Sequence, residues 1–594
     1  MLYIPALLMQ IRFVPPMTLP NKSHFHRLVR DLRVVMQTAQ LEPDLILGSA
    51  LAKWCNECFP GLPPPGLPIA LALQDEPAVS SFVEFVSKLD LIESTYWFSS
   101  AYAQLLGSEQ RKQMAMFFTP PSLTRRLLDD LSANGVDFST RSFCDPACGG
   151  AAFLAPIAMR MRDALRHQGA SAEEIMNHVQ KRILGFDQDA ALCELSKHFL
   201  LMALHDEIVT AHTYPELQVY HGDSLLQTKH LWGVLDVVVC NPPFRKMRAL
   251  EVHQYFDEFT DVVQGQPNLY ALFIALCIKL LAPGGICALV TPTSFLSGQN
   301  FSKLRSYMMA QTTLVGIGMV SDRLGVFIDV LQETALTLAR REKNGHPSTT
   351  EARISLVSKD GSYINVGNCF LPGMGAAWPI PRSESDIALL KFAAKSQIGL
   401  ADYGYAPRIG SFVWNRDTRT TYASAKSAVG ALGDTVVPLL WSSDIAPNGS
   451  LRFSGAPKAN KEGCFVNMGA INHRSIVRRP SVLLQRVTSN EQPRRLVAAT
   501  VPAQLIDTYG GFVGENHTVI LEQVSLEPPL APHQLVLLLG TPTVDRYFRC
   551  ISGATNVSVF ELGQLRLPDP ERLRSLLNQG YDMADAARKA LEML

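Results

Sequence analysis

The sequence has no excess of charge of either sign, because lysine and arginine together number 54 and aspartate and glutamate also number 54. Proteins that bind nucleic acid over a broad surface usually carry a net positive charge. The zero balance disfavours that class and predicts that any nucleic-acid surface is a local cationic patch. The hydrophobic fraction of 47% is enough to form packed cores and argues against wholesale disorder.

The eleven cysteines form no framework typical of disulfide-rich or zinc-binding proteins. Cys55 and Cys58 form one C-x-x-C pair, but no second pair stands at zinc-ribbon spacing, and a tetrahedral zinc site needs four ligands. Buried thiols are the simpler interpretation, so we predict no metal site. Cys144, Cys240 and Cys287 lie in apolar segments, which suits a reducing compartment.

Long uninterrupted apolar runs are absent as well. The apolar stretch at residues 1–10 is too short to span a bilayer and is ended by Arg12 and the Pro15–Pro16 pair. No basic segment precedes it, so it is a poor signal peptide. We therefore expect a soluble, cytoplasmic protein that does not associate with a membrane.

The pattern along the 594 residues predicts three regions. Residues 1–110 read as mostly helical. Residues 111–345 alternate short β-branched runs with helical stretches, which predicts a doubly wound, mostly parallel, Rossmann-like α/β sheet. Residues 346–594 have shorter segments rich in Gly, Pro and Ser and predict a separate domain of mixed α and β structure. The strands that we expect in the middle region are 142–144, 183–186, 219–221, 235–240 and 286–290.

A glycine-rich turn follows the first of these strands. Residues 145–154 read Asp-Pro-Ala-Cys-Gly-Gly-Ala-Ala-Phe-Leu and precede a predicted helix. Glycine lets the backbone turn sharply and approach a ligand closely. A doubly wound sheet binds its ligands at the carboxyl ends of its strands, where this turn would lie. By itself the turn is weak evidence, because an ordinary tight turn has the same composition.

Two further predicted strands also end in an acid. Asp187 follows strand 183–186, and its carboxylate can accept two hydrogen bonds from ribose hydroxyls. Gly222 and Asp223 follow strand 219–221, and this second carboxylate can accept from an adenine amine. Three successive strand ends that carry an acid, beginning at a glycine-rich turn, indicate a cofactor site.

The fourth strand, 235–240, runs directly into Asn241-Pro242-Pro243-Phe244. Proline cannot donate a ladder hydrogen bond, so the strand stops there and leaves the Asn241 side chain and the Pro242 carbonyl at the sheet edge. These two acceptors can bind both hydrogens of an exocyclic adenine amine and direct its lone pair at a methyl sulfonium. Positioning of this kind supplies most of the acceleration. Phe244 can stack on the base, which must first be flipped out of a duplex.

The order of these segments resembles the gamma class of adenine-N6 DNA methyltransferases from prokaryotic restriction–modification systems, in particular the type II modification methylases. The resemblance covers residues 111–345. It begins at Phe118-Thr119-Pro120-Pro121, passes through the segments above, and continues with Asn268–Phe273 and Gly325-Val326-Phe327. The C-terminal region resembles, more loosely, the target-recognition domains of larger restriction-associated adenine methylases.

The resemblance implies a site-specific, adenine-specific DNA methyltransferase that uses S-adenosylmethionine and no metal. Thr119 would contact the methionine end of the cofactor, Asp145 its amino group, Asp187 its ribose and Asp223 its adenine amine. The full set of implied cofactor contacts is Thr119, Asp145, Ala147, Gly149, Asp187, Asp223 and Phe273. The implied catalytic set is Asn241, Pro242, Pro243, Phe244 and Phe327.

Two positions depart from the family pattern. Ala151 stands where the family usually has glycine, and because alanine tolerates a positive φ poorly, we expect a loop of different shape. Ser224 stands where the family often has an apolar residue, which leaves more of the contact with the cofactor adenine to Phe273.

Residues 451–500 contain nine cations against two acids, a local excess of seven. Such an excess suits contacts with phosphates and guanine edges, although a solvated face has the same composition. Cations also follow the catalytic loop directly. The predicted contacts with double-stranded DNA are Arg245, Lys246, Arg474, Arg478, Arg479, Arg486, Arg494 and Arg495.

Other functions share parts of this pattern. Methyltransferases that act on the glutamine amide of release factors or on guanine amines in RNA use similar Asn-Pro-Pro loops, but they are typically shorter. A fused nuclease would need an acid two residues before a lysine. Before residue 111 the lysines are Lys22, Lys53 and Lys88, and the residues two positions ahead of them are Pro20, Leu51 and Val86, none of which is acidic. A relic without activity would not need the intact loop. We therefore predict a modification enzyme with a separate cognate endonuclease.

Overall fold

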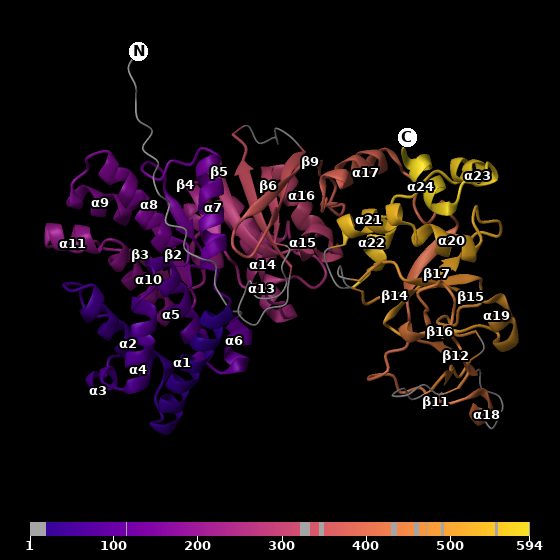
Figure 1. Ribbon diagram of the computed structural model, residues 1–594, viewed down its shortest axis with the longest axis horizontal. Coiled ribbons are helices and arrows are strands. Elements are labelled where there is room, and N and C mark those ends of the chain that lie inside the picture. Colours follow the sequence, from indigo (N-terminus) through magenta and orange to yellow (C-terminus); the bar gives the residue numbers. More distant parts are fainter. Residues whose placement is uncertain are drawn as a thin grey trace, which may run out of the picture. The chain divides into compact units, whose positions relative to one another are not determined.

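The computed structural model describes residues 19–114, 116–320, 333–343, 350–428, 436–456, 463–470, 472–488, 492–552 and 556–592. Its backbone divides into two compact units (Figure 1). Unit 1 comprises Met1–Pro292, Ala310–Ser348 and Ser355–Ile364, and unit 2 comprises Thr293–Met309, Thr349–Ile354 and Asn365–Leu594. The predicted helical region therefore shares a unit with the predicted methyltransferase domain, and the boundaries near residues 110 and 345 stay predictions.

Unit 1 begins with a group of helices. Proline at the first turn starts α2 and α4, and the Asp90 side chain caps α5 by accepting from the Glu93 amide at 2.9 Å. Helix α5 packs against α1, α2 and α4 as well as against α10, which explains why nearly all of its residues are buried (Figure 1). The bounds are α1 Leu19–Thr38, α2 Pro43–Cys58, α3 Leu71–Gln74, α4 Pro77–Ser87, α5 Leu91–Leu105 and α6 Ser108–Met114.

The sheet of unit 1 has its strands in the order β3-β2-β1-β4-β5-β7-β6. The first four pairings are parallel, and β7 inserts antiparallel to both β5 and β6. This arrangement confirms the predicted doubly wound, mostly parallel α/β fold. The strands are β1 Phe143–Asp145, β2 Ile183–Asp187, β3 Gln218–His221, β4 Leu235–Cys240, β5 Leu281–Pro292, β6 Thr312–Val320 and β7 Thr334–Arg341, and β8 Glu351–Val357 and β9 Tyr363–Phe370 follow in the chain.

Helices alternate with these strands in unit 1. They are α7 Pro121–Ala133, α8 Leu154–His167, α9 Ala172–Arg182, α10 Ala190–Ala203, α11 His205–Ala211, α12 Ser224–Gln227, α13 Ala249–Phe259 and α14 Leu269–Leu280. Helix α14 is apolar on almost every side and is buried accordingly. Among the described residues, no helix is both long and apolar enough to cross a membrane.

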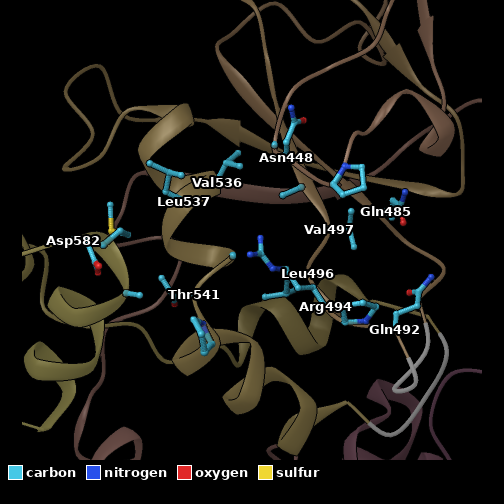
Figure 2. A pocket seen from close by; sticks show the side chains of 18 residues that line it. Asn448, Gln485, Gln492, Arg494, Leu496, Val497, Val536, Leu537, Thr541 and Asp582 are labelled. Atoms are coloured by element: carbon cyan, nitrogen blue, oxygen red, sulfur yellow. The ribbon is translucent and has the colours of Figure 1, made fainter.

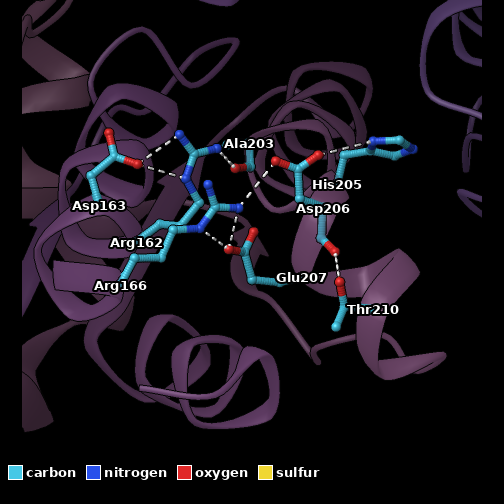
Figure 3. A network of polar contacts seen from close by, with 8 residues as sticks. All are labelled: Arg162, Asp163, Arg166, Ala203, His205, Asp206, Glu207 and Thr210. Atoms are coloured by element: carbon cyan, nitrogen blue, oxygen red, sulfur yellow. Dashed lines mark hydrogen bonds and ion pairs between the residues drawn. The ribbon is translucent and has the colours of Figure 1, made fainter. Parts of the chain in front are cut away.

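Charged contacts fix helix α8, which follows the glycine-rich turn (Figure 3). Arg162 donates to the Ala203 carbonyl at 2.7 Å. Arg166 donates to Glu207 at 2.5 Å and to Asp206 at 3.1 Å. Glu207 is 3% exposed, so its charge needs this cationic partner. The network connects α8 to the end of α10 and to α11, and thereby fixes the helix that follows the glycine-rich turn.

Unit 2 mixes short strands and helices, as predicted. One four-stranded sheet has the order β10-β17-β14-β15 and another has the order β11-β13-β12-β16. Its strands are β10 Tyr405–Ile409, β11 Thr421–Tyr422, β12 Val436–Leu440, β13 Phe465–Asn467, β14 Ser481–Gln485, β15 Ala498–Val501, β16 Val513–Gly514 and β17 Thr518–Gln523. The principal helices after residue 380 are α17 Glu384–Lys395, α19 Ala503–Tyr509, α20 Pro532–Leu539, α21 Pro542–Ile551, α23 Pro570–Asn578 and α24 Met583–Glu592.

Candidate cofactor and catalytic site

A cavity of about 190 Å³ lies at the carboxyl edge of the parallel strands in unit 1. Its wall combines the ends of β1, β2, β3 and β4 with the segment before α7 and the first turns of α14. Nine of the residues singled out from the sequence line it: Thr119, Asp145, Ala147, Gly149, Asp187, Asn241, Pro243, Arg245 and Phe273. The parallel topology brings them together from a stretch of some 150 residues.

The glycine-rich turn is held by hydrogen bonds from β2 and α10. The Gly149 amide donates to Asp187 Oδ2 at 2.9 Å, and Ser196 Oγ donates to the Gly149 carbonyl at 2.6 Å. Gly149 has a φ of +50°. Ala151 has a φ of +57° and thus takes the left-handed conformation despite its Cβ. The expectation that alanine would avoid this conformation was wrong, and the fully buried Ala151 side chain gains packing that offsets the strain.

The sequence alone did not reveal how closely α5 approaches this turn. A Cβ placed on Gly150 would lie 1.8 Å from Ser99 Oγ. Gly150 is therefore required because of a helix more than 40 residues earlier in the chain, and not because of its own φ. Phe117 is a second feature that sequence reasoning passed over, and it lines the cavity beside Phe118 of the Phe-Thr-Pro-Pro segment.

The two acids nearest the turn have altered acidity. Asp145 is 1% exposed, and burial together with the nearby Asp187 raises its pKa to about 8, against one stabilising bond from the Ala147 amide at 3.0 Å. Burial also raises the pKa of Asp187 to about 6, although it accepts from the amides of Gly149 and Asp189. A cationic ligand would relieve both carboxylates.

This donor set fits S-adenosylmethionine. Asp145 offers a buried carboxylate to an ammonium group, and the Asp187 oxygens keep lone pairs for ribose hydroxyls. Leu225, Leu269 and Phe273 offer an apolar lining to a nucleobase. Among the described residues, no group of three or more His, Cys, Asp or Glu side chains could hold a metal ion.

Asp223 lies just outside the lining. Its Oδ1 accepts from the Leu225 amide at 3.0 Å, and its Oδ2 accepts from the Tyr255 hydroxyl at 2.6 Å. Its neighbours Gly222, Ser224 and Leu225 form the wall instead. Ser224, which replaces the usual apolar residue, is buried and donates to the Pro146 carbonyl at 2.7 Å.

Asn241 has an unsatisfied acceptor. Its Nδ2 donates to the Phe117 carbonyl at 2.8 Å, which fixes the orientation of the amide. Its Oδ1 is buried and has no hydrogen-bond partner among the described residues. A buried acceptor without a partner costs free energy, of the order of 1–3 kcal/mol, and commonly marks the place where a ligand donates. Asn241 also lines the cavity, so an N–H group of a bound ligand would be a suitable donor.

The rest of the predicted catalytic set falls in three places. Pro243 lines the cavity, and its neighbour Pro242 is buried. Phe244 packs edge-on against Tyr270, with ring centroids 6.1 Å apart. Phe327 lies outside the described residues.

Comparison with known proteins agrees with this geometry. Residues 93–362 match the family model described as N-6 DNA Methylase. This part of the chain is therefore similar to N-6 DNA methylases. The resemblance inferred from the sequence is thereby confirmed at the level of the family, and the match reaches further back than residue 111 to include α5 with Ser99.

Two curated relatives are type II methyltransferases. The chain is 27% identical to M.PstI of Providencia stuartii over 354 residues and 23% identical to M.BsuBI of Bacillus subtilis over 348 residues. Each alignment covers 57% of this chain and 66% of the relative, just under two thirds of its length. The solved structure of the Type IIL restriction-modification enzyme MmeI in complex with DNA has a TM-score of 0.55 at 11% identity, covering 97% of this chain and 96% of that one, and shows the shared fold.

The two cations that follow the Asn241–Phe244 loop differ in whether their charge is paired. Arg245 forms an ion pair with Glu251, with Nη1 and Oε2 2.9 Å apart, and lines the cavity. Lys246 is exposed and forms an isolated bridge with Asn268. Lys246 is therefore accessible to a phosphate, whereas Arg245 would have to release or share Glu251.

The predicted DNA-contacting cations of unit 2 differ in exposure. Arg474, Arg478 and Arg479 are exposed. Arg486 is half-buried and donates to the Asn516 carbonyl at 2.9 Å. The predicted DNA contact of Arg495 is wrong, because this side chain is fully buried. It packs against Phe548 and donates from Nη2 to Ser552 Oγ at 2.9 Å. A phosphate cannot reach its guanidinium in this structure.

Arg494 lies in a different setting from its neighbour. It lines a cavity of about 800 Å³ within unit 2, and Figure 2 shows its guanidinium pointing into that cavity. Val536, Leu537 and Val497 give the wall a largely apolar character. Arg494 has no hydrogen bond or ion pair with any residue that the structure describes.

Proposed function

We propose that this chain transfers a methyl group from S-adenosylmethionine to the N6 amine of adenine in double-stranded DNA. The observation that carries the proposal is the buried Oδ1 of Asn241, which has no partner in the described part of the chain, on a residue that lines the same cavity as Asp145, Gly149 and Asp187. A site for an N–H donor thus adjoins a site with the chemistry of a nucleoside cofactor.

The cofactor would supply a methyl group on a positively charged sulfur. Asp145 and Thr119 would hold its amino acid end, Gly149 and Ala147 would let it approach the backbone, and Asp187 would hold its ribose. Phe273 would pack on its adenine, and Asp223 would act on that adenine from just outside the lining. The raised pKa of Asp145 means that a cationic ligand stabilises the ionised carboxylate.

Asn241 and Pro242 would orient the acceptor nitrogen. The amine would donate one hydrogen to Asn241 Oδ1 and the other to the Pro242 carbonyl, to which no described residue donates a hydrogen bond. Its lone pair would then point at the methyl carbon for in-line displacement. The carbon–sulfur bond breaks as the nitrogen–carbon bond forms, and the nitrogen then loses one proton to water, so no strong base is required.

The target base would have to leave the duplex to reach this cavity. Phe244 would stack on it, with Tyr270 behind, and Phe327 would complete the clamp. The type II methyltransferases to which the chain is similar support a role in a restriction–modification system. We propose accordingly that the chain protects sites that a separate cognate endonuclease cuts.

Single-molecule sequencing of plasmid from a methylation-free host tests this function. Expression of the chain should produce N6-methyladenine at one short recurring motif, and expression of Asn241→Ala should not. Unmodified plasmid from soluble protein that binds S-adenosylmethionine would contradict the DNA substrate and favour the alternative of an RNA or protein N-methyltransferase.

A further inference from the structure

Helix α13 begins directly after the catalytic loop and is fixed to it. Arg245, next to Phe244, pairs with Glu251 in the first turn of the helix, with Nη1 and Oε2 2.9 Å apart. The same Oε2 lies 3.3 Å from the Arg248 amide, which donates to it. The Arg245 guanidinium holds the pKa of the Glu251 carboxyl below its usual range, so the pair stays charged at neutral pH. The start of α13 therefore follows any movement of the loop.

One turn later the same helix contacts Asp223, beside the proposed cofactor site. Tyr255 is four residues beyond Glu251 and so lies on the same face. Its ring is 5% exposed, and its hydroxyl donates to Asp223 Oδ2 at 2.6 Å. The other oxygen of Asp223 accepts from the Leu225 amide at 3.0 Å and starts α12. Asp223 thus connects α13 to Gly222, Ser224 and Leu225, which we call the cofactor wall.

The connection spans the sheet. Strands β3 and β4 are separated by β2 and β1, so their ends are about 14 Å apart at the usual strand spacing. The two anchors on α13, Glu251 and Tyr255, are four residues apart, about 6 Å along the helix axis, so the side chains of Arg245, Glu251, Tyr255 and Asp223 cover the rest of the distance. A second link is shorter: the Leu269 amide donates to the Arg245 carbonyl at 2.8 Å and places α14, with Phe273, beside the loop.

We propose that Tyr255 is a positioning residue that couples the cofactor wall to the catalytic loop, so that cofactor and target DNA strengthen each other's binding. The inference rests on the proposed function. Tyr255 does not line the cavity and acts through Asp223. Coupling of this kind is reciprocal, so it is measurable from either ligand.

Tyr255→Phe is the direct test, because it removes the hydroxyl and keeps the buried ring. The matched control is Tyr220→Phe, on β3, whose ring is 46% exposed and whose hydroxyl has no partner among the described residues. The probe is S-adenosylhomocysteine, which cannot be turned over, titrated calorimetrically with and without a duplex that carries the motif found by sequencing. The ratio of the two Kd values is the coupling factor.

We expect Tyr255→Phe to raise the Kd for S-adenosylhomocysteine by about tenfold, because it loses a hydrogen bond to a charged group. It should also move the coupling factor towards one. Tyr220→Phe should change neither value. Glu251→Gln, at the other end of the connection, should lower the coupling factor while leaving the Kd without DNA unchanged, which covers the case in which Tyr255→Phe folds poorly.

If Tyr255→Phe has the same Kd and the same coupling factor as the wild type, the inference is overturned and the proposed function is left intact. A weaker Kd with an unchanged coupling factor would overturn it too, because Tyr255 would then only support the wall. Wild-type protein that binds no S-adenosylhomocysteine would overturn both the inference and the proposed function.

Discussion

Two sites were predicted from the sequence: the strand ends of unit 1 and the cationic residues 451–500 of unit 2. The structure brings the first set of residues together and places the second set in different environments. Asp145, Asp187 and Asn241 come together in one cavity. The arginines of residues 451–500 scatter: Arg479 is exposed, whereas Arg495 is fully buried. The strand order of a parallel sheet fixes where its carboxyl ends meet. No such rule says which face an arginine in a short strand or loop occupies.

Asn241→Ala should have the largest effect. Loss of the positioned acceptor should reduce methyl transfer by at least about 100-fold, by analogy with removal of one preorganised polar group from a catalytic site. Cofactor affinity should stay close to wild type, because the amide contacts the Phe117 carbonyl and the cavity, not the acids of the turn. Transfer of tritiated methyl to DNA and calorimetric titration with S-adenosylmethionine give the two values. A large loss of cofactor affinity would contradict the role assigned to Asn241.

Arg495→Ala should destabilise unit 2. The substitution leaves Ser552 without its donor. Burial raises the pKa of Glu561, and the substitution also removes a cation that partly offsets this rise. Removing a buried, hydrogen-bonded charge costs about 2–4 kcal/mol. Chemical denaturation measures the change. A stable variant that loses only DNA affinity would restore the sequence prediction for Arg495 and break the comparison.

The pH dependence of cofactor binding should follow Asp145. Its pKa is raised to about 8, so the carboxylate that an ammonium group requires is mostly protonated at pH 6 and about half ionised at pH 8. Affinity for S-adenosylmethionine should therefore rise between these values, by at most about tenfold per pH unit. The unliganded protein should lose stability over the same range, because the folded state binds more protons than the unfolded state. Titrations of wild type and Asp145→Asn check this, and an equal pH dependence in both would exclude Asp145 as its source.

Arg479→Ala should have the smallest effect. The side chain is exposed, so stability should be unchanged. If it contacts a phosphate, the slope of log Kd against log salt should fall by about one. Fluorescence anisotropy with a labelled duplex at several salt concentrations provides the slope. An unchanged slope would exclude Arg479 from the contacts with DNA phosphates.

Much of the fold and part of the site could be predicted because they depend on local pattern. The strands β1 to β4 lie within a residue or two of their predicted positions, since β-branched runs ended by Gly, Pro or an acid have few alternatives. Strand β5 is longer than predicted, from Leu281 to Pro292, because β4 pairs with Leu281 at its start and β7 pairs with it as far as Pro292.

The remainder depends on contacts between distant segments. The need for glycine at residue 150 comes from Ser99 on α5, and the engagement of Asp223 comes from Tyr255 on α13. The left-handed Ala151 and the buried Arg495 contradict single-residue propensities, because the surrounding packing decides both. The contacts of Gly150 with Ser99 and of Asp223 with Tyr255 correspond to no spacing or motif in the sequence.

The most direct test of the account is nucleoside mass spectrometry of DNA methylated by the purified chain. Unmethylated plasmid is incubated with S-adenosylmethionine that carries a deuterated methyl group, digested to nucleosides and analysed. The account predicts deuterated N6-methyldeoxyadenosine with wild-type protein and none with Asn241→Ala. Labelled N4-methyldeoxycytidine, or no labelled nucleoside from protein that binds the cofactor, would contradict it.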